Sequence, residues 1–285
     1  MQRALINKTV VTIYGQPQYD VLTLENQTST IQDEGLYGMP VEIIERANPS
    51  WVKVRTHYRY EGYIPVEDLY FLTQQEKVAW EAMKTQRRVI IKAYVDVLAC
   101  PKVQGIRLQT LTRGALVTLL SPAPTKGGWA KVKLNNGVEG YVKEGVFGSY
   151  YDTPSSQDET ALRKKIVASA LSYLGTQYRW GGKSPLGIDC SGLTSMAYLL
   201  NGIIIFRDAK IKEGFPVHPI EFEAKKPGDL FYYPGHVAMY IGDERYIHAT
   251  GHDGSDGVVI NSLNPNDLDY REDLPKMMYA VGSIF

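Results

Sequence analysis

Cysteine, long apolar runs and net charge are all scarce in this chain. Its 285 residues include only two cysteines, Cys100 and Cys190, which can form at most one disulfide. The sequence therefore excludes a disulfide-stapled secreted scaffold and predicts free thiols. Cys100 lies in an apolar segment, residues 97–101, where we expect a small buried side chain without a chemical role.

No stretch approaches the ~20 consecutive apolar residues of a membrane-spanning helix. Residues 1–7 also lack the apolar core of a signal peptide. We therefore expect a cytoplasmic protein. The alternative is a secreted or wall-associated protein, if an export signal precedes this sequence in the full gene.

The 31 basic and 31 acidic residues give a formal net charge of zero. No long-range field would gather nucleic acid or anionic lipid, so we expect neither a nucleic-acid nor a membrane partner. A neutral or small zwitterionic substrate is expected instead. Hydrophobic residues make up 44% of the chain, which is enough for the cores of two or three domains.

Residues 1–72 and 89–150 each hold short alternating runs separated by Gly, Pro and Asn turn signals, which predicts two small antiparallel β barrels. The two segments share a submotif, which indicates that they are internal copies of each other. Tyr63 and Tyr141 are expected in the barrel cores. Residues 73–88 predict a connecting helix. The two copies of the submotif are Trp51-x-Lys53-Val54 with Glu61-Gly62-Tyr63-Ile64, and Trp129-x-Lys131-Val132 with Glu139-Gly140-Tyr141-Val142.

Residues 151–285 begin with a polar linker, residues 151–156, after which the sequence pattern changes. Apolar spacing predicts a helix over residues 160–175 and a second from about Ser191 to Leu200. From Asp229 the period becomes two, which predicts consecutive strands at 230–233, 236–241 and 245–249. Helices followed by a meandering sheet give an α+β fold class.

Cys190 stands where a loop ends and the second helix begins. A thiol at a helix N-terminus feels the positive end of the helix dipole, which lowers its pKa toward the reactive thiolate. By itself this cysteine is better explained as a packing residue, the usual role of a cysteine in a domain of this kind. Two histidines change the balance, because His236 begins one predicted strand and His248 lies on the next. A thiolate nucleophile needs an imidazole base, and that base needs a third group to orient it.

Five motifs follow one another in this half of the chain: Tyr178-x-Trp180-Gly181-Gly182, Asp189-Cys190-Ser191-Gly192, Pro227-Gly228-Asp229-Leu230, Gly235-His236-Val237-Ala238 and Tyr246-Ile247-His248-Ala249. Together they resemble the NlpC/P60 family of cell-wall peptidases, and the two barrels resemble bacterial SH3 (SH3b) domains. The resemblance implies a papain-like catalytic domain at residues 151–285, with Cys190 as nucleophile, His236 as base and His248 orienting it. It also implies that Tyr178 lies near the oxyanion; the alternative is that Tyr178 and Trp180 only hold a loop in place.

Asp189 and Ser191 have two compatible interpretations. They are typical of a helix N-cap and first turn. They also resemble the family pair that holds the substrate's free α-amine and its D-glutamyl carboxylate. Residues 206–209 fall where relatives carry an Arg-Asp-Ser or Arg-Asp-Thr run; Ala209 replaces the hydroxyl residue here, and we assign this loop no role. His252 and Asp253 lack the further ligands of a zinc site, so no metal is expected.

Two barrels before an NlpC/P60 core are similar to the enzymes that cut murein peptides between γ-D-glutamate and an L-diamino acid, lysine or meso-diaminopimelate. In a subset of these, the first barrel presents an acid and a tyrosine to the free amine of L-alanine; Glu34 and Tyr70 are the candidates here. The expected partner is a free stem peptide, L-Ala-γ-D-Glu-L-diamino acid, met during peptide recycling. The expected enzyme is a monomer without a cofactor. The alternatives are a secreted hydrolase that uses its barrels to bind intact murein, and an acyltransferase or non-catalytic binder.

Overall fold

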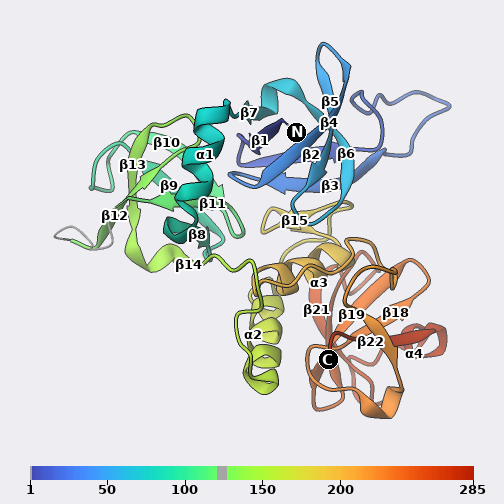
Figure 1. The fold of residues 1–285 in the computed structure, drawn as a ribbon. Helices are drawn as coiled ribbons and strands as arrows, with labels where there is room; N and C mark the ends of the chain where they lie inside the picture. The colour runs from blue at the N-terminus through green and yellow to red at the C-terminus, as the bar shows by residue number, and fades with distance from the viewer. Residues whose placement is uncertain (1, 121–126) are drawn as a thin grey trace. The chain divides into compact units, whose positions relative to one another are not determined.

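The computed structural model describes residues 2–120 and 127–285, and the chain divides into two compact units, Met1–Tyr150 and Tyr151–Phe285 (Figure 1). The N-terminal unit contains two seven-stranded antiparallel sheets, and the C-terminal unit contains a six-stranded sheet with its own helices.

The first sheet has the strand order β3-β2-β6-β5-β4-β1-β7. Alternating apolar residues such as Val52 and Val54 fill its interior. The last strand is followed by helix α1 (Gln74–Ala82), which begins at a capping box between Thr73 and Glu76 and continues into a 3-10 turn, Lys84–Gln86. The strands are β1 (Arg3–Ile6), β2 (Val10–Tyr14), β3 (Ile31–Leu36), β4 (Pro40–Asn48), β5 (Trp51–Thr56), β6 (Glu61–Pro65) and β7 (Leu69–Phe71), with a 3-10 turn at Val66–Asp68.

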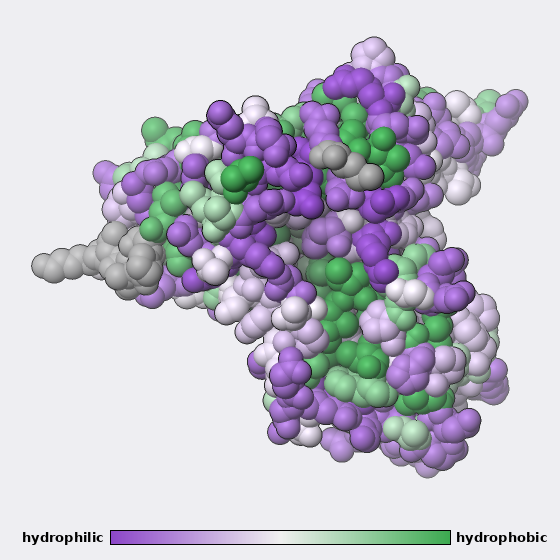
Figure 2. Space-filling model, viewed as in Figure 1, coloured by the Kyte–Doolittle hydropathy of each residue, from purple (hydrophilic) through white to green (hydrophobic). Residues whose placement is uncertain are grey.

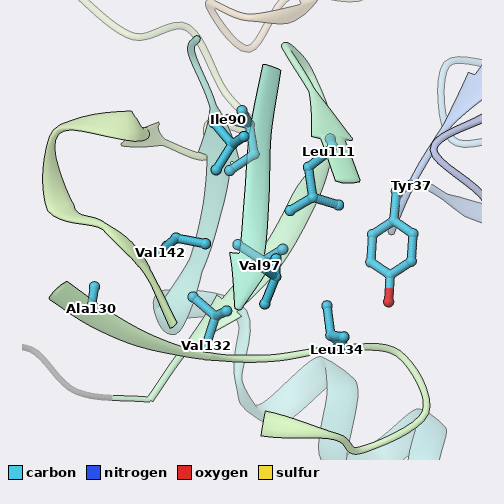
Figure 3. Close-up of a cluster of buried hydrophobic side chains, with 11 residues drawn as sticks. Tyr37, Ile90, Val97, Leu111, Ala130, Val132, Leu134 and Val142 are labelled. Carbon is cyan, nitrogen blue, oxygen red and sulfur yellow. The ribbon is translucent and has the colours of Figure 1, made fainter. Parts of the chain in front are cut away.

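The second sheet repeats this order as β10-β9-β13-β12-β11-β8-β14. Tyr37 of the first sheet's segment packs into its core beside Leu111 and Leu134 (Figure 3). The Tyr37 carbonyl also accepts from the Leu116 N–H at 2.8 Å, so main-chain bonding joins the two sheets. The strands are β8 (Arg87–Ile90), β9 (Tyr94–Leu98), β10 (Arg107–Thr112), β11 (Leu116–Leu119), β12 (Trp129–Lys133), β13 (Glu139–Lys143) and β14 (Phe147–Ser149), with a 3-10 turn at Glu144–Val146.

Two sequence predictions for the N-terminal unit are wrong in detail. Tyr63 and Tyr141 are only half-buried, because on strands β6 and β13 the inward positions are taken by their neighbours. The inward residues include Ile64 and Val142, both fully buried. Cys100 is only half-buried, since it lies in the turn that follows β9 rather than within a strand.

The C-terminal unit opens with helix α2 (Glu159–Leu171), which Asp158 caps by accepting from the Ala161 N–H at 2.6 Å. Helix α3 (Cys190–Leu199) packs against α2 and against strands β19 and β20. Its sheet is antiparallel with the order β17-β22-β18-β19-β20-β21. The remaining elements are β15 (Lys183–Ser184), β16 (Gly187–Ile188), β17 (His218–Ile220), β18 (Leu230–Tyr233), β19 (His236–Gly242), β20 (Arg245–Thr250), β21 (Gly257–Ser262), α4 (Asp273–Met277) and β22 (Ala280–Ser283), with a 3-10 turn at Phe222–Ala224.

The surfaces of the two units differ in character. In Figure 2 the visible face of the N-terminal unit is mostly hydrophilic, while apolar residues gather more densely on the visible face of the C-terminal unit. Within residues 2–120 and 127–285, no helix combines the length and apolarity that crossing a membrane requires.

Candidate active site

Cys190 is the first residue of α3, and local contacts fix where this helix begins. The Asp189 side chain caps the helix by accepting from the Gly192 N–H at 2.6 Å. A Cβ at position 192 would lie 2.1 Å from the Gly182 carbonyl oxygen, so only glycine lets the first turn pack this closely on the preceding loop. The cysteine is therefore held in place by its two neighbours in the motif.

The Cys190 sulfur lies against the start of β19. The residue as a whole is buried, with 5% of its surface exposed. Main-chain groups of Val237 and Ser191 hydrogen-bond it and favour the thiolate. Burial nevertheless raises the pKa of the Cys190 thiol, and the neighbouring Asp189 carboxylate raises it further. The sequence prediction that the helix start lowers this pKa is wrong in its net direction. The thiolate must therefore form as its proton passes to a base.

His236 and His248 form a hydrogen-bonded row, and its first member is the chain neighbour of Val237, whose main chain hydrogen-bonds Cys190. His236 is the first residue of β19 and directly precedes Val237, and its Nε2 lies 2.8 Å from His248 Nδ1 on β20. His248 is fully buried. Neighbouring antiparallel strands place these rings together although they are twelve residues apart in sequence. A thiol, a base and an orienting group thus occupy one region of the C-terminal unit.

Both histidines are held neutral. Burial lowers the pKa of His236, and the adjacent His248 and the Arg271 guanidinium lower it further. Burial also lowers the pKa of His248, opposed by a hydrogen bond to Asn261. A neutral His236 is the form that can accept a proton from a thiol.

Stability should depend on pH through these two rings. Because their folded pKa values lie below the unfolded value of about 6.5, the unfolded chain binds more protons in acid. The contribution of the two neutral rings to the free energy of unfolding is therefore fully present above about pH 6.5. It is lost as the pH falls below that value, by up to about 1.4 kcal/mol per pH unit for each ring. Urea unfolding between pH 7.5 and 5 should show this decline, and His248→Asn should make it shallower. His218→Asn, an exposed control, should keep the wild-type slope; equal slopes in all three proteins would contradict the account.

Tyr178 lies close enough to the start of α3 for charge on Cys190 to act on its phenol. Its backbone forms a β-bridge with Ile188, and its ring packs so closely on Gly251 that a Cβ there would lie 3.3 Å from the ring. Burial raises the pKa of the Tyr178 phenol, and negative charge on Cys190 and Asp189 raises it further. The phenol therefore stays protonated and can act as a hydrogen-bond donor.

Arg207 joins Asp189 and Ser191 into one buried cluster, and the sequence analysis gave it no role. Its guanidinium donates to both Asp189 carboxylate oxygens, at 3.0 and 3.1 Å, and to Ser191 Oγ at 2.7 Å. It also donates to the carbonyls of Gly181 and Gly182. The arginine is 2% exposed, so this planar donor array holds the loop before Cys190. The sequence did contain a signal for Arg207, the Arg-Asp run shared with relatives. Because Ala209 replaces the hydroxyl residue that ends this run in relatives, the segment was assigned no role.

Replacing Arg207 by methionine should therefore destabilise the chain strongly. The change leaves the Asp189 carboxylate buried without its cation, which typically costs about 3–5 kcal/mol. Arg245 is a matched control, since it pairs with Asp267 and Asp269 but is 40% exposed, and Arg245→Met should cost about 1 kcal/mol or less. Urea unfolding of the full chain measures both. Equal losses for the two variants would show that the buried cluster is not what holds this loop.

Glu34 and Tyr70 lie in the N-terminal unit. Glu34 is buried in the middle of β3, next to Asp33, whose carboxylate accepts from the Tyr58 hydroxyl at 2.5 Å. The Tyr70 hydroxyl donates to Glu76 at 2.6 Å and lines a hollow beside α1. Their predicted contact with a substrate amine stays a prediction. Among the described residues, no group of three or more His, Cys, Asp or Glu side chains is arranged to hold a metal, and His252 and Asp253 are exposed.

Comparison with known proteins gives relatives over the whole chain. Residues 175–271 match the model of the NlpC/P60 family. Dipeptidyl-peptidase 6 of Lysinibacillus sphaericus is 41% identical over 287 residues, which is 99% of each chain. Gamma-D-glutamyl-L-lysine dipeptidyl-peptidase of Bacillus cereus is 26% identical over 77% of this chain and 67% of its own. The crystal structure of an NlpC/P60 family protein from Bacillus cereus has the same fold, with a TM-score of 0.78 over 98% of both chains at 21% identity.

Proposed function

This chain belongs to the NlpC/P60 family and is a peptidase, and from that premise we propose that it hydrolyses the bond between γ-D-glutamate and the L-diamino acid of murein stem peptides. The observation that carries the chemistry is the hydrogen-bonded row of His236 and His248, whose first ring directly precedes Val237, the residue whose main chain hydrogen-bonds the Cys190 sulfur. The choice of bond is supported by the name of one relative, the gamma-D-glutamyl-L-lysine dipeptidyl-peptidase to which the chain is similar.

In the proposed reaction, Nδ1 of His236 takes the proton of the Cys190 thiol as the sulfur attacks the γ-carbonyl carbon of D-glutamate. The tetrahedral intermediate carries a negative oxygen, to which the Tyr178 phenol and the Cys190 N–H donate. The C–N bond then breaks, and His236 returns its proton to the departing α-amine of the diamino acid. Water, deprotonated by His236, hydrolyses the thioester and releases L-Ala-γ-D-Glu and the free thiol.

The buried cluster beside Cys190 supplies groups for the non-reacting part of this substrate. Asp189 is assigned to the free α-amine and Ser191 to the D-glutamyl α-carboxylate. The Ser191 hydroxyl oxygen accepts from Arg207. The hydroxyl proton of Ser191 therefore points outward or toward Asp189 Oδ1, 3.3 Å away. Arg207 fixes both side chains, so the site needs little rearrangement to bind a zwitterionic peptide. A monomer that recycles freed peptides in the cytoplasm is part of this proposal.

The substrate proposal is tested with three compounds: L-Ala-γ-D-Glu-L-Lys, its N-acetylated form and intact murein. We expect release of lysine and L-Ala-γ-D-Glu from the free-amine peptide alone, with inhibition by iodoacetamide and not by EDTA. Because a site built to pair an ammonium group penalises its absence, N-acetylation should lower kcat/KM by at least about 100-fold. Equal cleavage of both peptides would overturn the amine requirement. Solubilisation of intact murein would instead support a wall hydrolase.

A further inference from the structure

The histidine row does not end at His248, because Asn261 continues it on the neighbouring strand. Strand β21 pairs with β20 so that Asn261 lies opposite Tyr246 and beside His248 on one face of the sheet. Its Oδ1 lies 2.8 Å from His248 Nε2, and its Nδ2 lies 2.5 Å from the main-chain oxygen of Asp269. The residue is 6% exposed. Both ends of this amide are therefore bonded.

These contacts determine which way the amide faces. The Asp269 carbonyl can only accept a hydrogen bond, so the Asn261 NH₂ group must point toward it. The Asn261 oxygen then faces His248 and can only accept, which requires the proton of neutral His248 to be on Nε2. His248 Nδ1 is left with a lone pair, and at 2.8 Å it accepts from His236 Nε2–H.

We propose that Asn261 is a positioning residue of the reaction, which fixes the tautomers of both histidines so that Nδ1 of His236 is the basic nitrogen facing Cys190. This inference rests on the proposed role of His236 as the base. When the thiol proton moves to Nδ1, His236 becomes an imidazolium whose Nε2–H still donates to His248. No proton needs to move along the row. Throughout the cycle, His236 Nε2–H donates to His248 Nδ1, and His248 Nε2–H donates to Asn261 Oδ1.

Few charged or titratable groups face the two histidine rings, so a change in the pH dependence of kcat/KM can be interpreted. The neighbouring cation is Arg271 and the neighbouring carboxylate is Asp273, which act on both histidines with opposite sign. The Tyr233 ring lies 5.8 Å from His236 and the Tyr246 ring 5.3 Å from His248, and burial keeps both phenols protonated by raising their pKa. A new carboxylate at position 261 would therefore be an added charge next to the row.

Two substitutions separate positioning from a structural role. Asn261→Leu keeps the volume and removes the acceptor, and we expect kcat to fall about 100-fold with KM unchanged within about 3-fold, a smaller loss than the ~10⁴ caused by a wrong tautomer in a serine triad. Asn261→Asp keeps the acceptor toward His248; kcat should stay within about 10-fold of wild type. Its acid limb in kcat/KM should move to higher pH, because the carboxylate favours the protonated histidines. Asn264→Ala, a surface control on the same segment, should match wild type.

A kcat within 3-fold of wild type in folded Asn261→Leu would overturn the inference, as would equal losses and identical acid limbs in the Leu and Asp variants. If the Leu variant does not fold, the wild-type enzyme decides by ¹⁵N NMR of labelled histidine at pH 8. We expect His248 to be protonated on Nε2 and unprotonated on Nδ1. The reverse pattern would overturn the inference. This readout needs no substrate, so it stays informative even if the proposed bond is the wrong one.

Discussion

Cys190→Ala should reduce kcat/KM for L-Ala-γ-D-Glu-L-Lys by roughly 10⁵- to 10⁶-fold, the scale seen when the nucleophile of a covalent hydrolase is removed. Without the sulfur no thioester can form, and only the donors around the oxyanion remain. The fold should persist, because Cys190 contributes a small buried side chain to a helix start that Asp189 and Gly192 hold. Circular dichroism and urea unfolding check that point alongside the kinetics.

Cys100→Ala is the matched control for this variant. Cys100 is the other thiol of the chain, and it lies half-buried in the N-terminal unit. Its replacement should leave kcat/KM within about 2-fold of wild type and leave iodoacetamide inhibition intact. If the Cys100 variant instead became insensitive to iodoacetamide, the nucleophile would have been misassigned.

His236→Asn should lower kcat by roughly 10³- to 10⁶-fold, since asparagine can neither take the thiol proton nor return it to the departing amine. The thiol itself should also become unreactive, because burial disfavours its anion and no base is left to accept the proton. Iodoacetamide should then alkylate Cys190 far more slowly at neutral pH. His218→Asn, on an exposed edge strand, serves as the control and should change neither rate.

Residues that act as a unit give non-additive losses, which supplies a sharper test of this pair. The double variant Cys190→Ala/His236→Asn should be no slower than Cys190→Ala alone within about 3-fold. Losses that multiply would mean that the two side chains act independently.

Local signals made much of the C-terminal unit predictable. Asp189 caps α3 through its own side chain, so the helix start can be read within four residues of sequence. Strand β18 coincides with the predicted 230–233, and β19 and β20 differ from prediction by one residue at their ends. The alternation on β6 and β13 was equally visible, but Tyr63 and Tyr141 were wrongly predicted in the core, where Ile64 and Val142 take the inward positions.

Tertiary contacts made the rest unpredictable. Arg207 meets Asp189 eighteen residues away, from a segment without regular structure that no period marks. Asn261 joins the histidine row only because β21 pairs with β20 in one register, and a single asparagine carries no sequence signal of such a contact. The direction of the Cys190 pKa shift also depends on burial, which a motif cannot reveal.

The most direct test of the account is the acyl-enzyme itself. Wild-type protein mixed with excess L-Ala-γ-D-Glu-L-Lys, quenched in acid within milliseconds and digested, should yield a peptide containing Cys190 with the added mass of an L-Ala-γ-D-Glu acyl group. The N-acetylated substrate and the Cys190→Ala variant should give no adduct. An adduct on another residue, or full turnover by Cys190→Ala, would contradict the central claim that this thiol attacks the γ-D-glutamyl carbonyl.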